Sequence, residues 1–257
     1  MKNIILQPFI YVISLFEHIG RYFDLMSKTL RSFTTWHLYI GFLPEHMIKL
    51  GISALPIVVV TGLFSGMVTS VQTAYQLESG FIPDSYVGGI VCVSVLMELS
   101  PMITALVMTG RVGASIAAEI GTMRVSEQID ALEVMGVNSF NYLIFPKIIS
   151  LMLYPFLITL AMFLGILGGY IASVYAGFST SFDFIQGIQL DFKVFHVIYA
   201  YIKTTLFAFI LATIPSYHGF FMKGGALEVG KASNISFVWT SIVIIIINFV
   251  VTQLLLA

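Results

Sequence analysis

Five stretches of this sequence are apolar over about twenty residues or more, and this feature leaves few folds open to the chain. They cover about 48–72, 87–110, 144–174, 194–214 and 235–256. A helix of about 20 apolar residues crosses the roughly 30 Å hydrocarbon layer of a bilayer. Only 10% of the residues are charged, against about 25% in an ordinary soluble domain. The sequence therefore predicts an all-α integral membrane protein with five transmembrane helices in one domain, residues 1–257.

Proline and polar residues set the expected ends of these helices. Pro215 is expected to end the fourth span, because proline lacks the N–H that an α-helix needs. The stretches 73–86, 175–193 and 216–234 are rich in polar residues and glycine, and we expect each of them to be a loop.

Residues 8–34 carry a different pattern from the five apolar stretches. Apolar side chains recur there every three or four residues, and so do the charged ones, namely Glu17, Arg21, Asp24, Lys28 and Arg31. Such spacing is typical of an amphipathic helix. Because its charged stripe opposes insertion, we expect this helix to lie in the headgroup plane of the membrane. A soluble helix packed on a partner is the alternative.

The basic residues are distributed unevenly along the chain. If the N-terminus is in the cytoplasm, ten of the twelve Lys and Arg residues fall in cytoplasmic segments. The loop at 73–86 then has no basic residue, and the loop at 175–193 has only Lys193. Since cytoplasmic loops are enriched in Lys and Arg, this distribution predicts a cytoplasmic N-terminus and a C-terminus on the outer side.

Two charged residues, Glu98 and Lys203, fall near the middle of the second and fourth spans. A charge at that depth costs at least about 2.5 to 3.5 kcal/mol on insertion scales, so each must face a partner, a cavity or water. The two side chains could form an ion pair with each other, which would be structural. They could instead line the polar part of a transport cavity, and the sequence leaves both readings open.

Small residues recur at four-residue spacing in the first and third spans. They are Gly62, Gly66 and Ser70, and Gly165, Gly169 and Ser173. Small residues at this spacing let two helix backbones approach closely. The contact could be ordinary packing within the bundle, a seam between two copies of the chain, or the lining for a bulky substrate.

A short amphipathic helix is predicted at about 125–136, between the second and third spans. One face would carry Val125, Ile129, Leu132 and Met135, and the other Glu127, Gln128, Asp130 and Glu133. Gly136 follows at the position that favours a helix C-cap. On the cytoplasmic side, such a helix could dock in the groove of a partner. It could also lie on its own bundle.

Several kinds of chemistry have no motif in the chain. There is no GxxxxGK[ST] phosphate loop, no HExxH or GxSxG motif and no pair of cysteines, since Cys92 is the only one. We therefore expect no catalytic residue, no metal site and no bound cofactor. The net charge of −1 also gives no reason to expect nucleic acid as a partner. Energy for any active transport would have to come from another subunit.

The stretch GRVGASIAAEIGTMRVSEQIDALEVMGVN resembles the signature of the MlaE family of ABC transporter permeases. The stretches PIVVVTGLFSGMVTSVQ, ELSPMITALVMTGR and GGALEVGKAS resemble other parts of that family, so the likeness covers nearly the whole chain. The sequence departs from the family at residues 138–140, where many members have a proline.

The resemblance implies a permease subunit that moves phospholipid or a related lipid in a bacterial inner membrane, with a periplasmic C-terminus. It implies a homodimer with two copies of an ABC ATPase, which would bind the ATP and Mg. It also implies a ring of MCE-domain protein on the periplasmic side. A small cytoplasmic regulatory subunit is a further candidate partner. The lipid and the direction of transport stay open.

The resemblance also implies site residues. A lipid pocket between the two copies would be lined by Val68, Thr69, Gln72, Leu77 and Glu98. The surface coupled to the ATPase would include Glu119, Arg124, Glu127, Ile129, Asp130, Leu132, Glu133 and Met135. Two other classes of protein are alternatives: a membrane enzyme acting on lipid, with Glu98 as acid or base, and a secondary transporter.

Overall fold

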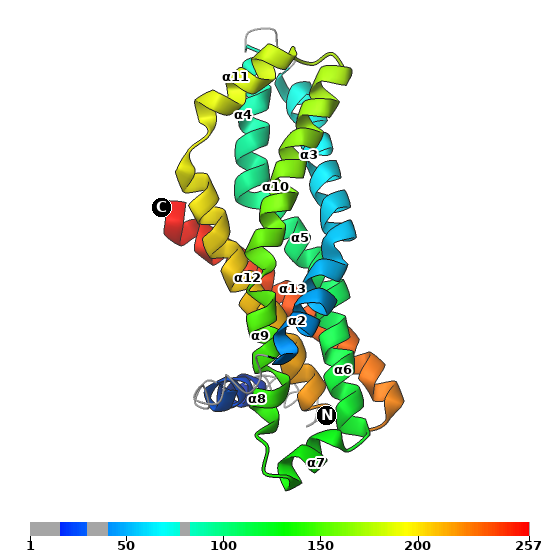
Figure 1. Cartoon of the computed structure of the whole chain (residues 1–257). Coiled ribbons are helices and arrows are strands. Elements are labelled where there is room, and N and C mark those ends of the chain that lie inside the picture. Colours follow the sequence, from blue (N-terminus) through cyan, green and yellow to red (C-terminus); the bar gives the residue numbers. More distant parts are fainter. Residues whose placement is uncertain (1–15, 30–40, 78–82, 257) are drawn as a thin grey trace, which may run out of the picture.

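The computed structural model describes residues 16–29, 41–77 and 83–256, and all regular structure in these residues is helical. Among these residues, five helices or runs of consecutive helical segments are long and apolar enough to cross a membrane. They are Leu43–Leu77, Ser85–Val125, Ser139–Tyr175, Val194–Phe220 and Ala226–Leu256. Figure 1 shows them as one elongated bundle. The predicted all-α membrane fold with five spans is therefore confirmed.

The first two spans are built from several consecutive helical segments. The first span consists of α2 (Leu43–His46), the π-helix η2 (Met47–Gly51), the 3₁₀ turn η3 (Ile52–Ala54) and α3 (Leu55–Leu77). The second span consists of α4 (Ser85–Ser94), the π-helix η4 (Val95–Leu99), α5 (Ser100–Met108), the π-helix η5 (Thr109–Gly113) and α6 (Ala114–Val125). The second span thus continues well past its expected end near residue 110.

The remaining elements complete the bundle. The short α7 (Gln128–Val134) joins the second span to the third, which consists of α8 (Ser139–Leu143), α9 (Phe145–Leu151) and α10 (Tyr154–Tyr175). The fourth and fifth spans are α12 (Val194–Phe220) and α13 (Ala226–Leu256). Between the third and fourth spans lies α11 (Ser181–Asp191), in a stretch expected to be a loop. Thr180 caps α11, accepting a hydrogen bond from the Asp183 N–H at 3.2 Å.

The fourth span does not end at Pro215, which lies inside α12. Membrane helices tolerate proline where neighbouring groups satisfy the freed backbone. The hydroxyl of Ser216 donates to the carbonyl of Ala212 at 2.6 Å beside this position. Only residues 221–225 separate α12 from α13, so most of the loop expected at 216–234 is helical.

The small residues of the first and third spans face each other inside one chain. A Cβ on Gly66 would lie 1.7 Å from the carbonyl oxygen of Gly165, and one on Gly62 would lie 2.7 Å from that of Ala161. Because α3 and α10 approach this closely along their length, both stripes are buried in the bundle. They are therefore intramolecular packing surfaces rather than a seam between two copies.

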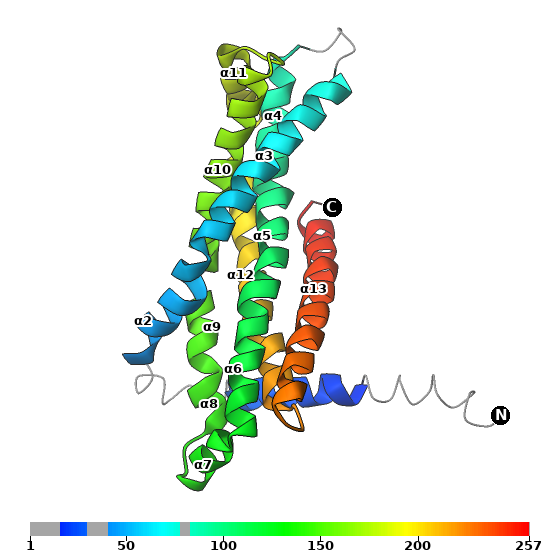
Figure 2. The same cartoon turned by 90° about the vertical axis from the view of Figure 1, so that its right-hand side faces the viewer.

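The described part of the predicted N-terminal helix covers residues 16–29, while 8–15 and 30–34 lie outside the described residues. This helix lies across the long helices at one end of the bundle (Figure 2). The Tyr22 hydroxyl is 2.7 Å from that of Thr213 on α12, and Leu25 is fully buried. Phe16, Ile19 and Phe23 remain exposed. One face of this helix thus contacts the bundle, and an apolar stripe of the helix stays exposed. The location of the helix in the headgroup plane of the membrane stays a prediction.

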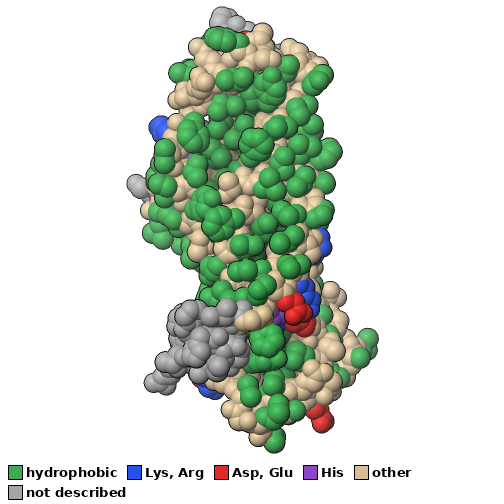
Figure 3. All heavy atoms as spheres, viewed as in Figure 1, with side chains coloured by type: hydrophobic (Ala, Val, Ile, Leu, Met, Phe, Trp, Pro, Cys, Tyr) green, Lys and Arg blue, Asp and Glu red, His purple; other side chains and the backbone are tan. Residues whose placement is uncertain are grey.

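Figure 3 shows hydrophobic side chains along the whole visible face of the bundle, with charged ones mainly near the end that carries α2 and α7. This distribution agrees with a surface that meets lipid over most of its length. The end that carries α7 and the helix at 16–29 is termed the inner end.

Candidate functional site

The carboxylate of Glu98 is the centre of a polar network within the membrane-spanning part. Its Oε1 accepts hydrogen bonds from the Tyr199 hydroxyl at 3.0 Å and from the Thr252 hydroxyl at 3.2 Å. The same oxygen accepts a hydrogen bond from the Lys203 ammonium group. Its Oε2 accepts from the amide of Asn248 at 3.0 Å. The network therefore joins the second, fourth and fifth spans.

The local helix geometry places Glu98 in this network. Glu98 lies on η4, a π-helical turn in the second span. Pro101 lies three residues after Glu98 and cannot donate a backbone hydrogen bond to the carbonyl of residue 97. A π-turn, with its i to i+5 bonds, accommodates such an interruption, and π-turns are frequent at functional sites. The sequence element Ser100–Pro101 thus helps to set the position of the carboxylate.

Glu98 and Lys203 form an ion pair with each other, one of the two arrangements that the sequence left open, while a role of Glu98 in lining a transport cavity stays a prediction. The Lys203 side chain is 0% exposed, and its Nζ lies 4.4 Å from the centre of the Tyr199 ring. A buried ammonium group is tolerated only when a partner compensates its charge. The Glu98 side chain is 38% exposed, so it still faces the surface of the single chain.

Two members of this network, Tyr199 and Thr252, were not expected from the sequence. Tyr199 lies four residues before Lys203, and Thr252 lies four residues after Asn248. Residues four apart share one face of a helix, so each pair points to the same place. The four-residue spacing in the sequence could indicate which side chains share a helix face. It could not indicate which faces of the second, fourth and fifth spans contact each other.

The predicted lipid-pocket residues do not all lie together in the single chain. Val68 and Gln72 are exposed on α3, and the Thr69 hydroxyl is bonded to the carbonyl of Ser65 at 2.7 Å. Leu77 packs against a small core formed by Val87, Val91, Val95 and Phe184. The hydrogen bonds of Glu98 go instead to α12 and α13.

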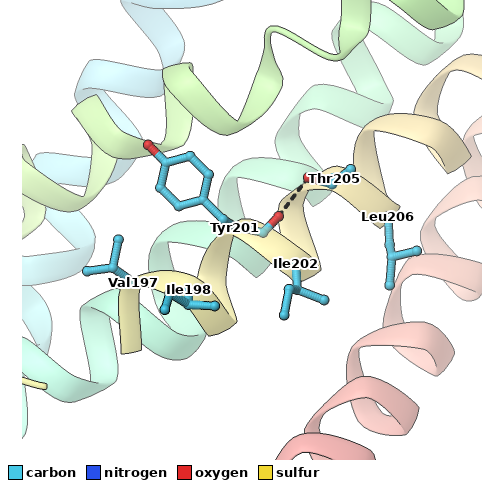
Figure 4. Close-up of a pocket in the computed structure, with 6 residues that line it drawn as sticks. All are labelled: Val197, Ile198, Tyr201, Ile202, Thr205 and Leu206. Atoms are coloured by element: carbon cyan, nitrogen blue, oxygen red, sulfur yellow. Dashed lines mark hydrogen bonds between the residues drawn. The ribbon is translucent and has the colours of Figure 1, made fainter. Parts of the chain in front are cut away.

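A shallow apolar hollow lies on the exposed side of α12 (Figure 4). Its lining residues are Val197, Ile198, Tyr201, Ile202, Thr205 and Leu206. The Tyr201 side chain reaches α10, where its hydroxyl is 2.6 Å from that of Thr159. Because all six lining residues belong to one helix, the hollow is a surface groove and contains none of the predicted pocket residues.

The helix predicted at 125–136 is present but shorter, since α7 covers only Gln128–Val134. Glu127 precedes it with a left-handed φ of 58°, which interrupts the helix after α6. Ile129 is fully buried in the chain, so it anchors α7 and is not available to a partner. The predicted apolar docking face is therefore corrected, because Ile129 packs inside the chain and is not part of an exposed face.

Polar contacts hold α7 in place from both sides. Arg124 at the end of α6 forms an ion pair with Asp130 at 2.8 Å and lies 5.9 Å from the ring centre of Phe220. The Glu133 carboxylate accepts a hydrogen bond from the Ser139 hydroxyl at 2.9 Å. These contacts fix the helix relative to α6 and α8.

The outer side of α7 combines apolar and acidic side chains. Val134 is 89% exposed and Met135 is 68% exposed, whereas Leu132 is half-buried. The same short segment also exposes three acidic residues, namely Glu127, Asp130 and Glu133. Figure 1 shows α7 at the extreme inner end of the bundle. An exposed helix with apolar and charged residues at this position suits a partner groove.

Glu119 was expected on the same surface, but its carboxylate is engaged inside the bundle. One oxygen pairs with Lys49 at 2.6 Å and the other with Lys147 at 2.8 Å. This residue therefore connects elements of the chain itself, and its contact with an ATPase stays a prediction. Among the described residues, no group of three or more His, Cys, Asp and Glu side chains is placed to hold a metal ion.

Comparisons with known proteins agree on one family. The family model described as "Permease MlaE" matches residues 43–254. A "Probable ABC transporter permease protein" of Rickettsia bellii is 35% identical over 243 residues, 94% of this chain and 93% of that protein. The "Intermembrane phospholipid transport system permease protein MlaE" of Haemophilus influenzae is 29% identical over 250 residues, 95% of this chain and 94% of that protein. A chloroplast protein of Arabidopsis thaliana, "Protein TRIGALACTOSYLDIACYLGLYCEROL 1", is 31% identical over 219 residues, 81% of this chain and 60% of that protein.

Proposed function

The chain belongs to the MlaE permease family, and we propose that it moves phospholipid or a related lipid with energy from a separate ATPase subunit. As an ABC transporter permease, it is a transport subunit and not an enzyme. The Haemophilus relative is named for intermembrane phospholipid transport, which supports the proposed substrate class.

The observation that carries the proposal is the exposed surface of α7. Val134 and Met135 form an exposed apolar tip on a short segment that also exposes three acidic residues, at the inner end of the bundle. Such a tip would insert into an apolar groove with a basic rim on the ATPase. ATP and Mg would be bound by that partner, and this chain would supply the coupling helix.

In the proposed mechanism, the ATPase pushes on α7, and the movement of α7 changes how the spans are arranged. Because Ile129 and the ion pair between Arg124 and Asp130 hold α7 to the bundle, a movement of α7 would carry α6 with it. Closure of two ATPase subunits would thus shift two copies of this chain against each other. Lipid would then leave a pocket between the copies, lined by the residues predicted on α3 together with Glu98.

The burial of the spans supports a second copy of the chain. In the most apolar stretch of each span, only 28% of the first and 22% of the fifth are buried, against 50% to 56% in the other three. The first and fifth spans therefore have the most surface left for a partner. We propose that the copies meet there, and that an MCE-domain ring lies on the opposite side from the ATPase.

The placement of basic residues supports an inner-membrane orientation with the N-terminus in the cytoplasm. Lys49, Lys147, Arg124 and Lys231 gather toward the inner end, together with α7. Cytoplasmic segments favour Lys and Arg, and the ATPase must also bind on that side. The C-terminus at the far end of α13 would then face the periplasm.

A reading of Glu98 as the acid or base of a lipid-acting enzyme has little support. Its carboxylate accepts hydrogen bonds from four side chains, one of which is the buried ammonium group of Lys203. These contacts engage both carboxylate oxygens within the bundle. They leave it poorly suited to exchange a proton with a substrate.

Substitution of the exposed tip tests the proposed role of α7. Met135→Asp and Val134→Asp place a charge where an apolar contact is expected, and both side chains are exposed, so folding should not suffer. We expect each variant to lose at least about tenfold in affinity for the ATPase, since central interface contacts are worth about 2 kcal/mol or more and about 1.4 kcal/mol is tenfold. Co-purification with the ATPase and titration of its binding would measure this loss.

The matched control is Leu227→Asp, because Leu227 is also an exposed apolar residue at the inner end. It lies at the start of α13 and outside α7. Its binding of the ATPase should equal that of the unmodified chain. Normal ATPase binding by both α7 variants would show that α7 is not the docking element.

A further inference from the structure

The carboxylate of Glu119 joins three helical elements at the inner end. Glu119 lies on α6, while Lys49 lies on η2 at the start of the first span and Lys147 lies on α9 in the third. Each carboxylate oxygen takes a different lysine, at 2.6 Å and 2.8 Å. One side chain thus forms direct ion pairs with two other spans.

The three charges differ in burial, and this separates their roles. Lys147 is 1% exposed, Glu119 is 23% exposed and Lys49 is 51% exposed. A buried ammonium group without a counter-charge is strongly unfavourable, so Lys147 requires Glu119 for its stability. The pair with Lys49 is half open to solvent and contributes little to folding.

Glu119 connects α6 with elements outside its main packing contacts. α6 packs mainly on α12 and α13, whereas α2 and η2 pack on α9, which itself also packs on α12. The segment 120–146, which carries α7, begins and ends beside the pair of Glu119 with Lys147. The ion pair therefore closes this segment at its base, and Lys49 extends the connection to the first span.

We propose that Glu119 is the joint that passes movement of α7 to the first span, with Lys49 as the link. A displacement of α7 moves α6, and Glu119 then moves Lys49 and the π-helix η2 with it. π-Turns are locally less regular than an α-helix and often mark places where a helix adapts. The first span bears the predicted pocket residues Val68, Thr69 and Gln72, so this movement reaches the lipid site. The inference rests on the proposed function.

Lys49→Met tests the link with little effect on folding, because it leaves the buried pair of Glu119 with Lys147 intact. The permease, its ATPase and its periplasmic partner would be reconstituted in phosphatidylethanolamine and phosphatidylglycerol vesicles carrying a fluorescent phospholipid. ATP hydrolysis and lipid transfer would be measured on the same samples. We expect ATP hydrolysis to stay near its normal rate, and lipid moved per ATP to fall about fivefold, the lower range of allosteric coupling.

Two further variants make the result specific. Lys49→Arg keeps the positive charge and should restore the normal ratio of lipid to ATP. Lys231→Met removes a comparably exposed lysine, paired with Glu228 at the start of α13, and should leave the ratio unchanged. Glu119→Gln should lower the ratio and the melting temperature together, because it also leaves Lys147 without its counter-charge.

The outcomes separate this inference from the proposed function. A normal ratio of lipid to ATP in Lys49→Met, or an equal fall in Lys231→Met, would overturn the role of Glu119 as a joint. If the unmodified complex moves no lipid on ATP addition, the proposed function itself fails, whatever the variants do.

Discussion

At the scale of single residues, the pair of Glu98 and Lys203 shows that two opposite charges can have unequal roles. Lys203 is completely buried, and its charge is compensated by Glu98. Glu98 is partly exposed and has three further hydrogen-bond donors, from Tyr199, Asn248 and Thr252. The chain therefore depends more on the carboxylate than on the ammonium group.

This asymmetry predicts an order of stability among three variants. Glu98→Ala should destabilise the chain by about 3 kcal/mol, because it leaves a buried charge unpaired. Lys203→Met should cost only about 1 kcal/mol, since the carboxylate keeps its other donors. The double variant should be more stable than Glu98→Ala alone. Thermal unfolding of the four proteins in one detergent would measure the order.

The double variant is the internal control of this experiment, because coupled residues give non-additive effects. If the destabilisation of the double variant equals the sum of the two single effects, Glu98 and Lys203 do not form an ion pair.

The sequence could predict that Glu98 and Lys203 needed partners, but not that they would pair. Their depth follows from their positions in two apolar stretches. Their pairing depends on how the second and fourth spans are rotated about their axes, which the surrounding packing decides. For the same reason, the contacts of Tyr199 and Thr252 with Glu98 could not be predicted. Hydroxyl side chains are common in membrane helices, and their partners depend on which helix faces them.

At the scale of helices, the crossing of α3 and α10 depends on glycine. A methyl group on Gly66 would clash with the backbone of α10, because its Cβ would lie 1.7 Å from the carbonyl oxygen of Gly165. Gly66→Ala should therefore force the two helices apart and destabilise the chain by at least about 1 to 3 kcal/mol, the usual cost of overpacking. The yield of folded protein and its melting temperature would measure this effect.

Gly230→Ala is the matched comparison, since Gly230 lies in helix α13 and a methyl group added there would meet no atom within 4 Å. Alanine favours a helix over glycine by about 1 kcal/mol, so this variant should be as stable as the unmodified chain or more so. Equal stability of Gly66→Ala and Gly230→Ala would contradict the close crossing.

Helix positions were predictable from apolar stretches, while several helix ends were not. Pro215 was expected to end a helix from its local chemistry, yet α12 continues because its neighbours hold that part of the helix in place. α7 was expected from its periodicity, and the burial of Ile129 could not be read from the same pattern. Apolar periodicity indicates that a face is buried or bound, but it does not identify what covers it.

At the scale of the whole molecule, the apolar stretches predicted the five spans, and the family resemblance predicted the transport class. The arrangement of the spans was not predictable, because several pairings of five apolar helices satisfy the same hydrophobic pattern. The pairing of the first span with the third follows from small residues that meet on both helices. The low burial of the first and fifth spans then leaves surface for a second copy.

The central claim is that this chain moves lipid only when a separate ATPase drives it. The most direct measurement is transfer of a fluorescent phospholipid by the reconstituted chain, with and without its ATPase and with and without ATP. We predict transfer above background only when the ATPase and ATP are both present. Transfer or chemical conversion of the lipid by the chain alone would contradict this claim and favour a secondary transporter or an enzyme.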